Sequence, residues 1–225
     1  ELYGAANKAD PNWSRPIAVL ASIDWYEAKQ GWSASREKSI KSGMELAERA
    51  IQMDPNDPLG YQALGNLYRL KGQAERAIEM RRKAAELAPN DYLAIAGLAT
   101  VLKDFGEEQE AVKLFERAMR LSPKHPWHVS YAYGVTLFLV DRKEEAVQSL
   151  RKAIDQNPTH VLPKAFLAAV YVDLGRLDEA KATANQVIQL NPSFTATRLI
   201  KSHTFHDPAK DFHFRNLMHR ARLPE

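Results

Sequence analysis

Histidines are the residues of this sequence that most readily suggest metal chemistry. Four of the seven lie in the carboxyl-terminal tail, and His125 lies three residues before His128; the tail positions are His203, His206, His213 and His219. Zinc sites built on histidine need a complete ligand set, such as H-E-x-x-H or histidines combined with cysteines or carboxylates. Neither pattern occurs, and the chain has no cysteine. We therefore expect solvated or capping histidines, with no metal and no other cofactor.

Other patterns that could support catalysis or nucleic-acid binding have structural explanations. Glu107–Glu108 and Glu144–Glu145 stand where second helices would begin, and negative charge there favours the helix dipole. The serines lack a nucleophile-elbow context, and no glycine-rich phosphate loop occurs. The basic run Arg81–Lys83 has no interleaved aromatics for stacking on bases, so we expect a solvated convex face. The sequence predicts a chain that is not an enzyme and does not bind nucleic acid, with any catalytic domain located upstream.

Composition restricts the class of protein without locating it. The chain has 225 residues, a formal net charge of +3 and no apolar run long enough to cross a bilayer. The lack of cysteine excludes disulfides but fits any compartment; the cytoplasm is favoured, and the periplasm stays open. The sequence begins at Glu1 rather than methionine, and we expect a fragment of a longer protein.

Prolines that follow amphipathic segments mark a repeat. They stand at Pro55, Pro89, Pro123, Pro158 and Pro192, which gives intervals of 34, 34, 35 and 34 residues. Proline suits these places because it lacks an N–H and cannot continue the helix before it. The period therefore predicts a series of similar units.

The stretch from Pro58 to Pro89 shows what each unit is. Its apolar spacing predicts two short helices joined by a tight turn, with small residues where the helices touch, at Gly65, Ala77 and Ala84. Such a hairpin cannot bury its apolar faces alone and needs copies stacked beside it. The pattern resembles the tetratricopeptide repeat (TPR), W-x2-L-G-x2-Y, then A-x3-F, then P. Its slots hold Tyr61, Leu64, Gly65, Tyr68, Ala77, Arg81 and Pro89, and only Arg81 departs from the pattern.

This resemblance implies an all-α fold, a right-handed TPR superhelix (α-solenoid) with a carboxyl-terminal capping helix. We expect one solenoid domain over residues 1–225. It would comprise a half repeat at 1–11, repeats at 14–55, 58–89, 92–123, 127–158 and 161–192, and capping helices at 193–225. In the long first repeat, Gly31 should end one helix and Ser33 or Ser35 should cap the next. In the tail, Asp207 should cap a helix that has Pro208 at its first position.

In TPR proteins the first helix of each hairpin lines a concave groove. The resemblance therefore assigns partner binding to the corresponding positions here: Trp25, Gln62, Asn66, Arg69, Thr100, Lys103, His128, Tyr131, Phe138 and Val172. The amino half of this set is polar and mildly cationic, and the carboxyl half is apolar with aromatics. A partner with an acidic or amide-rich end and an apolar end would match. Of the clamp with which some TPR modules hold chaperone carboxyl termini, only Asn66 is present, so that activity is not expected.

A narrower resemblance concerns the carboxyl half. The segments VYVDLGRLDEAKATANQVIQLNPSFT and FHDPAKDFHFRNLMHRARLPE resemble the carboxyl-terminal TPR region of bacterial class III adenylate/guanylate cyclases. This resemblance implies a regulatory or scaffolding region attached to a signalling protein, which binds a protein or peptide in its groove and does not insert into a membrane. The alternatives are a free-standing assembly adaptor and a self-associating module that forms a homodimer through the amino-terminal half repeat.

Overall fold

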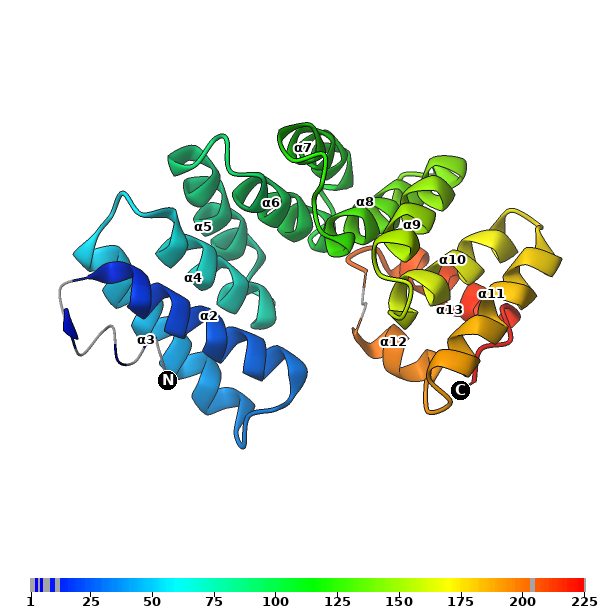
Figure 1. Ribbon diagram of the computed structural model, residues 1–225, viewed down its shortest axis with the longest axis horizontal. Helices are drawn as coiled ribbons and strands as arrows, with labels where there is room; N and C mark the ends of the chain where they lie inside the picture. The colour runs from blue at the N-terminus through cyan, green and yellow to red at the C-terminus, as the bar shows by residue number, and fades with distance from the viewer. Residues whose placement is uncertain (1–2, 4, 6–8, 11–12, 203–204, 225) are drawn as a thin grey trace. The chain divides into compact units, whose positions relative to one another are not determined.

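The computed structural model describes residues 3, 5, 9–10, 13–202 and 205–224. All regular structure within these ranges is helical, and consecutive helices pair as antiparallel hairpins (Figure 1). In chain order the helices are α2 (Ser14–Gln30), α3 (Arg36–Met53), α4 (Pro58–Leu70), α5 (Ala74–Leu87), α6 (Tyr92–Asp104), α7 (Glu108–Leu121), α8 (Trp127–Leu139), α9 (Lys143–Gln156), α10 (Val161–Asp173), α11 (Leu177–Leu190), α12 (Ala196–Ser202) and α13 (Pro208–Arg220). The predicted all-α class is confirmed. Most of the predicted half repeat, including Ala6 and Pro11, lies outside the described residues.

The turns inside the hairpins use residues that tolerate the left-handed backbone conformation. Gly31, Gly72, Gly106 and Gly175 have φ between 70° and 92° and follow the first helix of their hairpins. In the remaining turn this position is held by Asp141, with φ of 64°. Aspartate is among the few non-glycine residues that visit this region at modest cost. The predicted end of α2 at Gly31 is confirmed.

Side chains cap the starts of α3, α4 and α13. Asp57 accepts a hydrogen bond from the N–H of Leu59 at 3.1 Å, and Ser35 accepts one from the N–H of Lys38 at 3.3 Å. Asp207 accepts from the N–H of Ala209 at 2.8 Å, directly before Pro208. Each bond satisfies a donor that the first turn of a helix leaves unpaired. The predicted caps at Ser35 and Asp207 are confirmed.

Small residues set how closely the two helices of a hairpin approach. A Cβ placed on Gly65 would lie 3.3 Å from the carbonyl oxygen of Ala77. A Cβ on Gly134 would lie 2.8 Å from Leu150 Cγ and 3.3 Å from the carbonyl oxygen of Ala146. These distances leave no room for a larger residue. The prediction that a small residue lies where the helices touch is confirmed at Gly65, and Gly134 of α8 follows the same rule.

The chain divides into two compact units, Glu1–Val101 (unit 1) and Leu102–Glu225 (unit 2). In unit 1, α2 and α4 pack side by side as first helices, and α3 and α5 are their second helices. In unit 2, α8 and α10 are the first helices, and α9 and α11 are the second. We call the side of the first helices that faces away from the second helices the inner face of each unit.

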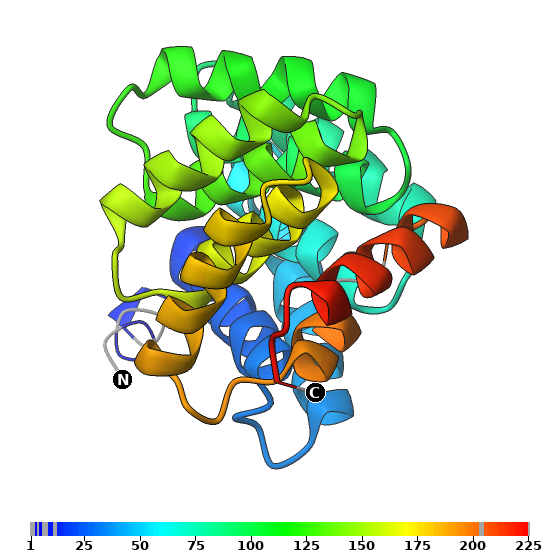
Figure 2. The same ribbon diagram turned by 90° about the vertical axis from the view of Figure 1, so that its right-hand side faces the viewer.

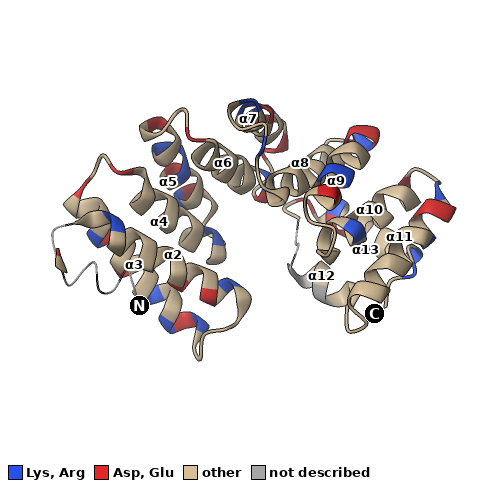
Figure 3. Cartoon of the chain, in the orientation of Figure 1, with Lys and Arg blue, Asp and Glu red and all other residues tan. Residues whose placement is uncertain are grey.

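The charged residues follow this division. Figure 3 shows Lys, Arg, Asp and Glu concentrated on second helices such as α5, α9 and α11. The first helix α8 has none of these residues, and nearly all of its side chains are buried. Solvated charge on one helix of a pair and apolar packing on the other is the pattern expected when hairpins bury a shared core.

His125, in the loop before α8, has a structural role in unit 2. Its side chain is 2% exposed. Lys152 Nζ lies 3.2 Å from its Nε2, its Nδ1 lies 3.3 Å from the carbonyl oxygen of Pro126, and Gln156 Nε2 donates to its backbone carbonyl at 2.8 Å. The lysine donates to Nε2, which fits a neutral ring that carries its proton on Nδ1. Burial, followed by the charge of Lys152, lowers the pKa of His125 below its usual 6.5.

We expect acid to destabilise unit 2 through this histidine. With a lowered pKa in the folded state, His125 takes up its proton more readily in the unfolded chain, so stability is complete above about pH 6.5 and falls as the pH drops below it. The slope contributed by one such group is at most about 1.4 kcal/mol per pH unit. Urea unfolding at pH 7.5 and pH 5.5 should show a smaller pH effect for His125→Asn than for wild type. Equal pH effects would contradict this role.

Candidate functional site

The candidate residues of unit 1 lie on three first helices. Trp25 is on α2, Gln62, Asn66 and Arg69 are on α4, Thr100 is on α6, and all five are half-buried. Two of them carry buried donors: Trp25 Nε1 and Gln62 Nε2 have no hydrogen-bond partner within the described part of the chain. Thr100, by contrast, is satisfied, because its Oγ1 donates to the carbonyl oxygen of Ala96 at 2.8 Å.

Arg81 joins this group from the second helix α5. Its Cγ would lie 2.9 Å from a Cβ on Gly65, and its guanidinium Nη1 would overlap a Cβ on Gly97. The side chain therefore passes between α4 and α6, where Nη2 donates to Asn66 Oδ1. Arg81 is 6% exposed. The expectation that it belongs to a solvated convex face is wrong; its neighbour Lys83 is the exposed cation of that run.

A signal for this arrangement was present in the sequence. Arg81 stands in a repeat slot that the next two hairpins fill with Phe115 and Leu150, both fully buried, and that the α11 hairpin fills with the buried Ala184. A charged residue in that slot needs space, and Gly97 supplies it on the next first helix. The departure of Arg81 from the repeat pattern thus indicates a buried side chain in unit 1, not a substitution on the solvent-exposed surface.

The candidate residues of unit 2 are mostly covered. Tyr131, Phe138 and Val172 are buried, Lys103 is buried and pairs with Asp104, and His128 is exposed. Burial raises the pKa of the Tyr131 hydroxyl well above its usual value of 10. As folded, this set presents little apolar surface to a partner.

Helix α13 covers one member of this set, Phe138. It packs beside α10 (Figures 1 and 2) and places Phe214 against the first helices. The Phe214 ring stacks on Phe166 with centroids 4.5 Å apart and meets Phe138 edge-on at 6.3 Å. The neighbouring Phe205 is also buried and lies 5.2 Å from Phe214. The predicted capping segment therefore lies across the inner face of unit 2.

Polar contacts hold the amino-terminal half of the same segment. Lys210 Nζ lies 2.9 Å from Glu108 Oε1, at the start of α7. His213 Nε2 lies 2.9 Å from Asp173 Oδ1, at the end of α10. The ring of His206 lies close to Gly106, where an added Cβ would come within 2.9 Å of it. The tail thus contacts both the hairpin directly before it, through Asp173, and the α6–α7 hairpin, through Glu108 and Gly106.

No metal site is apparent among these histidines. Within the described residues, no group of three or more His, Cys, Asp or Glu side chains could hold an ion. His206 and His213 contact the rest of unit 2 as described above, and His203 lies outside the described residues.

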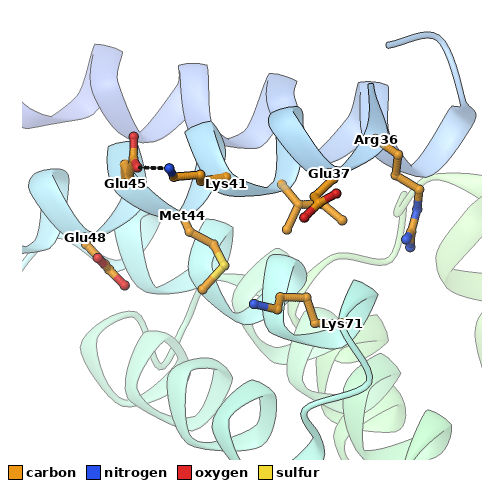
Figure 4. Close-up of a pocket in the computed structure, with 8 residues that line it drawn as sticks. Arg36, Glu37, Lys41, Met44, Glu45, Glu48 and Lys71 are labelled. Atoms are coloured by element: carbon orange, nitrogen blue, oxygen red, sulfur yellow. Dashed lines mark ion pairs between the residues drawn. The ribbon is translucent and has the colours of Figure 1, made fainter. Parts of the chain in front are cut away.

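A hollow also lies along the outer side of α3, beside Lys71 (Figure 4). Its lining mixes both signs of charge, from Arg36 and Lys41 to Glu37, Glu45 and Glu48. Lys41 and Glu45 pair at 3.9 Å, and both are largely exposed. Exposed pairs of this kind contribute little energy and define no specific ligand. The hollow is a solvated part of the second-helix side.

None of the helices in the described ranges is both long enough and apolar enough to pass through a bilayer.

Comparisons with known proteins agree with the helical-hairpin geometry. No curated protein sequence matches the chain. Solved structures that resemble it include PilW, a type IV pilus biogenesis factor, with a TM-score of 0.69 and 16% identity over 90% of each chain. TTC0263, a TPR protein of Thermus thermophilus, has a TM-score of 0.63 and 19% sequence identity over 85% of this chain and 98% of its own. YrrB, a TPR protein with an unusual peptide-binding site, has a TM-score of 0.59 and 18% sequence identity over 86% of this chain and 94% of its own.

At these identities the solved structures establish the fold alone. The sequence itself carries the family assignment, because a profile described as tetratricopeptide repeat matches residues 13–192, which is most of the chain. The chain belongs to the tetratricopeptide repeat family.

Proposed function

We propose that this chain is a non-catalytic module that binds a peptide or protein segment on the inner face of unit 1. The observation that supports it is the pair of buried donors without partners, Trp25 Nε1 and Gln62 Nε2, on the same face as Asn66. A buried donor left unpaired is costly, and acceptors on an incoming chain would relieve that cost. TPR proteins generally mediate protein–protein interactions and are typically not catalysts. YrrB, similar in fold, is described as having a peptide-binding site.

The candidate residues of unit 2 enter this proposal in a second step. Phe138 is covered by α13, and Val172 is buried on the helix against which α13 packs. We infer that these residues, with Tyr131, contact a partner only when α13 is displaced. Exposed His128 and the Asp104-paired Lys103 complete the predicted set.

Replacing Gln62 with alanine tests the unit 1 face directly. The Nε2 atom makes no hydrogen bond within the fold, so Gln62→Ala should leave the melting temperature near that of wild type. It should weaken peptides selected against the wild-type chain about 3- to 10-fold, the size of one neutral hydrogen bond. The matched control is Gln52→Ala on α3, where the side chain is exposed on the second-helix side. Equal affinities for both variants would contradict binding at this face.

The finer proposal is that this module regulates or localises a signalling domain, such as a nucleotide cyclase, in the same polypeptide. It rests on the resemblance of residues 170–195 and 205–225 to cyclase-associated TPR regions. Sequencing the complete reading frame tests it. A cyclase domain upstream is the expected result, and a frame that encodes no output domain would contradict it.

Self-association is the second candidate, and exposed aromatics in the first hairpin favour it. Trp32 is 72% exposed, and its ring meets the half-exposed Tyr26 edge-on at 5.4 Å. Exposed aromatic pairs of this kind are common at protein interfaces. Sedimentation equilibrium should show a dimer that Trp32→Ser weakens; a monomer at all concentrations would exclude this candidate. The amino-terminal half repeat proposed for the same dimer lies largely outside the described residues.

A further inference from the structure

Arg81 is a buried cation that has no counter-ion among the described residues. It is 6% exposed, and its hydrogen-bond partner is the neutral amide oxygen Asn66 Oδ1. Its Nε has no hydrogen-bond partner, and no ion pair of Arg81 occurs in the described part of the chain. The charged side chain that acts on it is Arg69, which carries the same sign. Burial, followed by Arg69, lowers the pKa of Arg81 to about 10.

An isolated buried charge is costly, and folded proteins normally pair it. The repeat itself does not require a charge at this position, because the equivalent slots of later hairpins hold the buried apolar residues Phe115, Leu150 and Ala184. Gly65 and Gly97 leave the space that the longer, charged side chain occupies. The local structure of unit 1 is therefore shaped around a guanidinium that stability alone does not require.

Other buried polar groups near Arg81 also lack hydrogen-bond partners among the described residues. Gln62 Nε2 lies one helical turn before Asn66 on α4, Trp25 Nε1 lies on the adjacent α2, and both are donors without acceptors. Two buried acceptors of unit 1 also lack partners among the described residues: Asp24 Oδ2, whose side chain packs from α2 against Gly43 of α3, and Gln73 Oε1, at the start of α5. The inner face of unit 1 thus has an excess of donors around one positive charge. Its chemical complement is an anionic acceptor.

We propose that Arg81, held by Asn66 and assisted by Arg69, binds a carboxylate of the partner peptide on the inner face of unit 1. This inference rests on the proposed peptide-binding function and names the chemistry of its ligand. A guanidinium is the side chain best suited to a carboxylate, because its donors lie in one plane and can form paired hydrogen bonds. The carboxylate can belong to an acidic side chain or to the free end of a peptide. Carbonyl oxygens flanking it would satisfy Gln62 and Trp25.

Short peptides of defined charge test the proposal and separate its two sources. We would measure binding to acetyl-(Glu)4-amide, to acetyl-(Gln)4 with a free carboxyl terminus, and to acetyl-(Gln)4-amide by calorimetry at low ionic strength. The wild type should prefer at least one carboxylate peptide over the neutral peptide by about ten-fold or more, as expected for a hydrogen bond to a charged group. The first peptide reports acidic side chains and the second reports the terminus. No preference for either would overturn the site.

Variants then assign the preference to Arg81. Arg81→Met, which keeps the length and removes the charge, should abolish the preference, whereas Lys83→Met removes an exposed cation of the same helix and should retain it. Arg81→Lys keeps the charge but loses the planar fork, and it should bind the carboxylate peptides with intermediate affinity even if Arg81→Met folds poorly. A preference unchanged in Arg81→Met and Arg81→Lys would overturn the proposal.

The peptide measurements also distinguish failure of the carboxylate site from failure of the proposed peptide-binding function. Longer peptides that bind the inner face equally well with glutamate or glutamine would retain the proposed function and exclude the carboxylate site. The chain could instead bind acetyl-(Glu)4-amide in an Arg81-dependent way and bind none of the longer peptides. That result would retain the carboxylate site and exclude peptide binding on the inner face.

Discussion

Phe214→Ala is expected to lower the free energy of unfolding of unit 2 by about 3–5 kcal/mol, the usual cost of removing a fully buried phenylalanine. The side chain is 0% exposed and stacks on Phe166 at 4.5 Å, with Phe138 and Phe205 at its edges. Its removal would leave a cavity between α13 and the first helices that rigid helix packing cannot close. Urea denaturation followed by circular dichroism measures the loss.

The same helix provides the control. Phe212 is 67% exposed, two residues before Phe214, so Phe212→Ala makes the same chemical change without removing a core contact. We expect its effect to stay within about 0.5 kcal/mol, as for surface substitutions in general. Similar losses for the two variants would mean that α13 is not docked through the Phe214 side of the helix.

Ending the chain after Ser202 is expected to expose the inner face of unit 2. The deletion removes Phe205 and the whole of α13, and with them the side chains that cover Phe138 and Phe166. A newly exposed apolar face of this kind promotes association or binding of apolar dyes. We expect strong enhancement of anilinonaphthalene sulfonate fluorescence, loss of stability in unit 2, and concentration-dependent self-association.

A substitution at the edge of α13 serves as the matched comparison. Lys210→Met breaks the contact with Glu108 but keeps the aromatic packing, so dye fluorescence should stay close to the wild-type level. A shortened chain that binds no dye and remains monomeric would show that α13 does not shield an apolar face. In that case the second step of the proposed function would lose its support.

The hairpins were predictable because their determinants are local. Proline spacing, the left-handed glycines and the small residue at Gly134 each act within one hairpin, so they can be read in sequence order. Asp141 follows the same rule with a different residue, because its turn needs the same backbone conformation as the glycine turns. Local rules of this kind also gave the caps at Ser35 and Asp207.

The placement of α13 was not predictable, because it depends on contacts between distant segments. Its cap and its amphipathic pattern predicted a helix, but Phe214 meets Phe166 and Lys210 meets Glu108 through folding back across earlier repeats. The sequence pattern does not say which apolar face a terminal helix covers. For the same reason, the sequence does not indicate that α13 covers Phe138.

Arg81 shows a different kind of limit. In the sequence it is visible as the departure from the repeat, but its basic chain neighbours suggest a solvated surface. Its environment is set by Gly65 and Gly97 on two different first helices, so the burial follows from tertiary packing. One pattern would have indicated that Arg81 is buried: a charged residue in an apolar repeat slot, together with a glycine in the first helix of the next hairpin.

Hydrogen exchange of the chain with a selected peptide bound at saturation tests the central claim most directly. Binding on the inner face of unit 1 should slow exchange in α2, α4 and the 92–101 part of α6, and leave the outer side of α3 and α5 near its free rate. Protection confined to α3 and α5, or no protection anywhere in unit 1, would contradict the account.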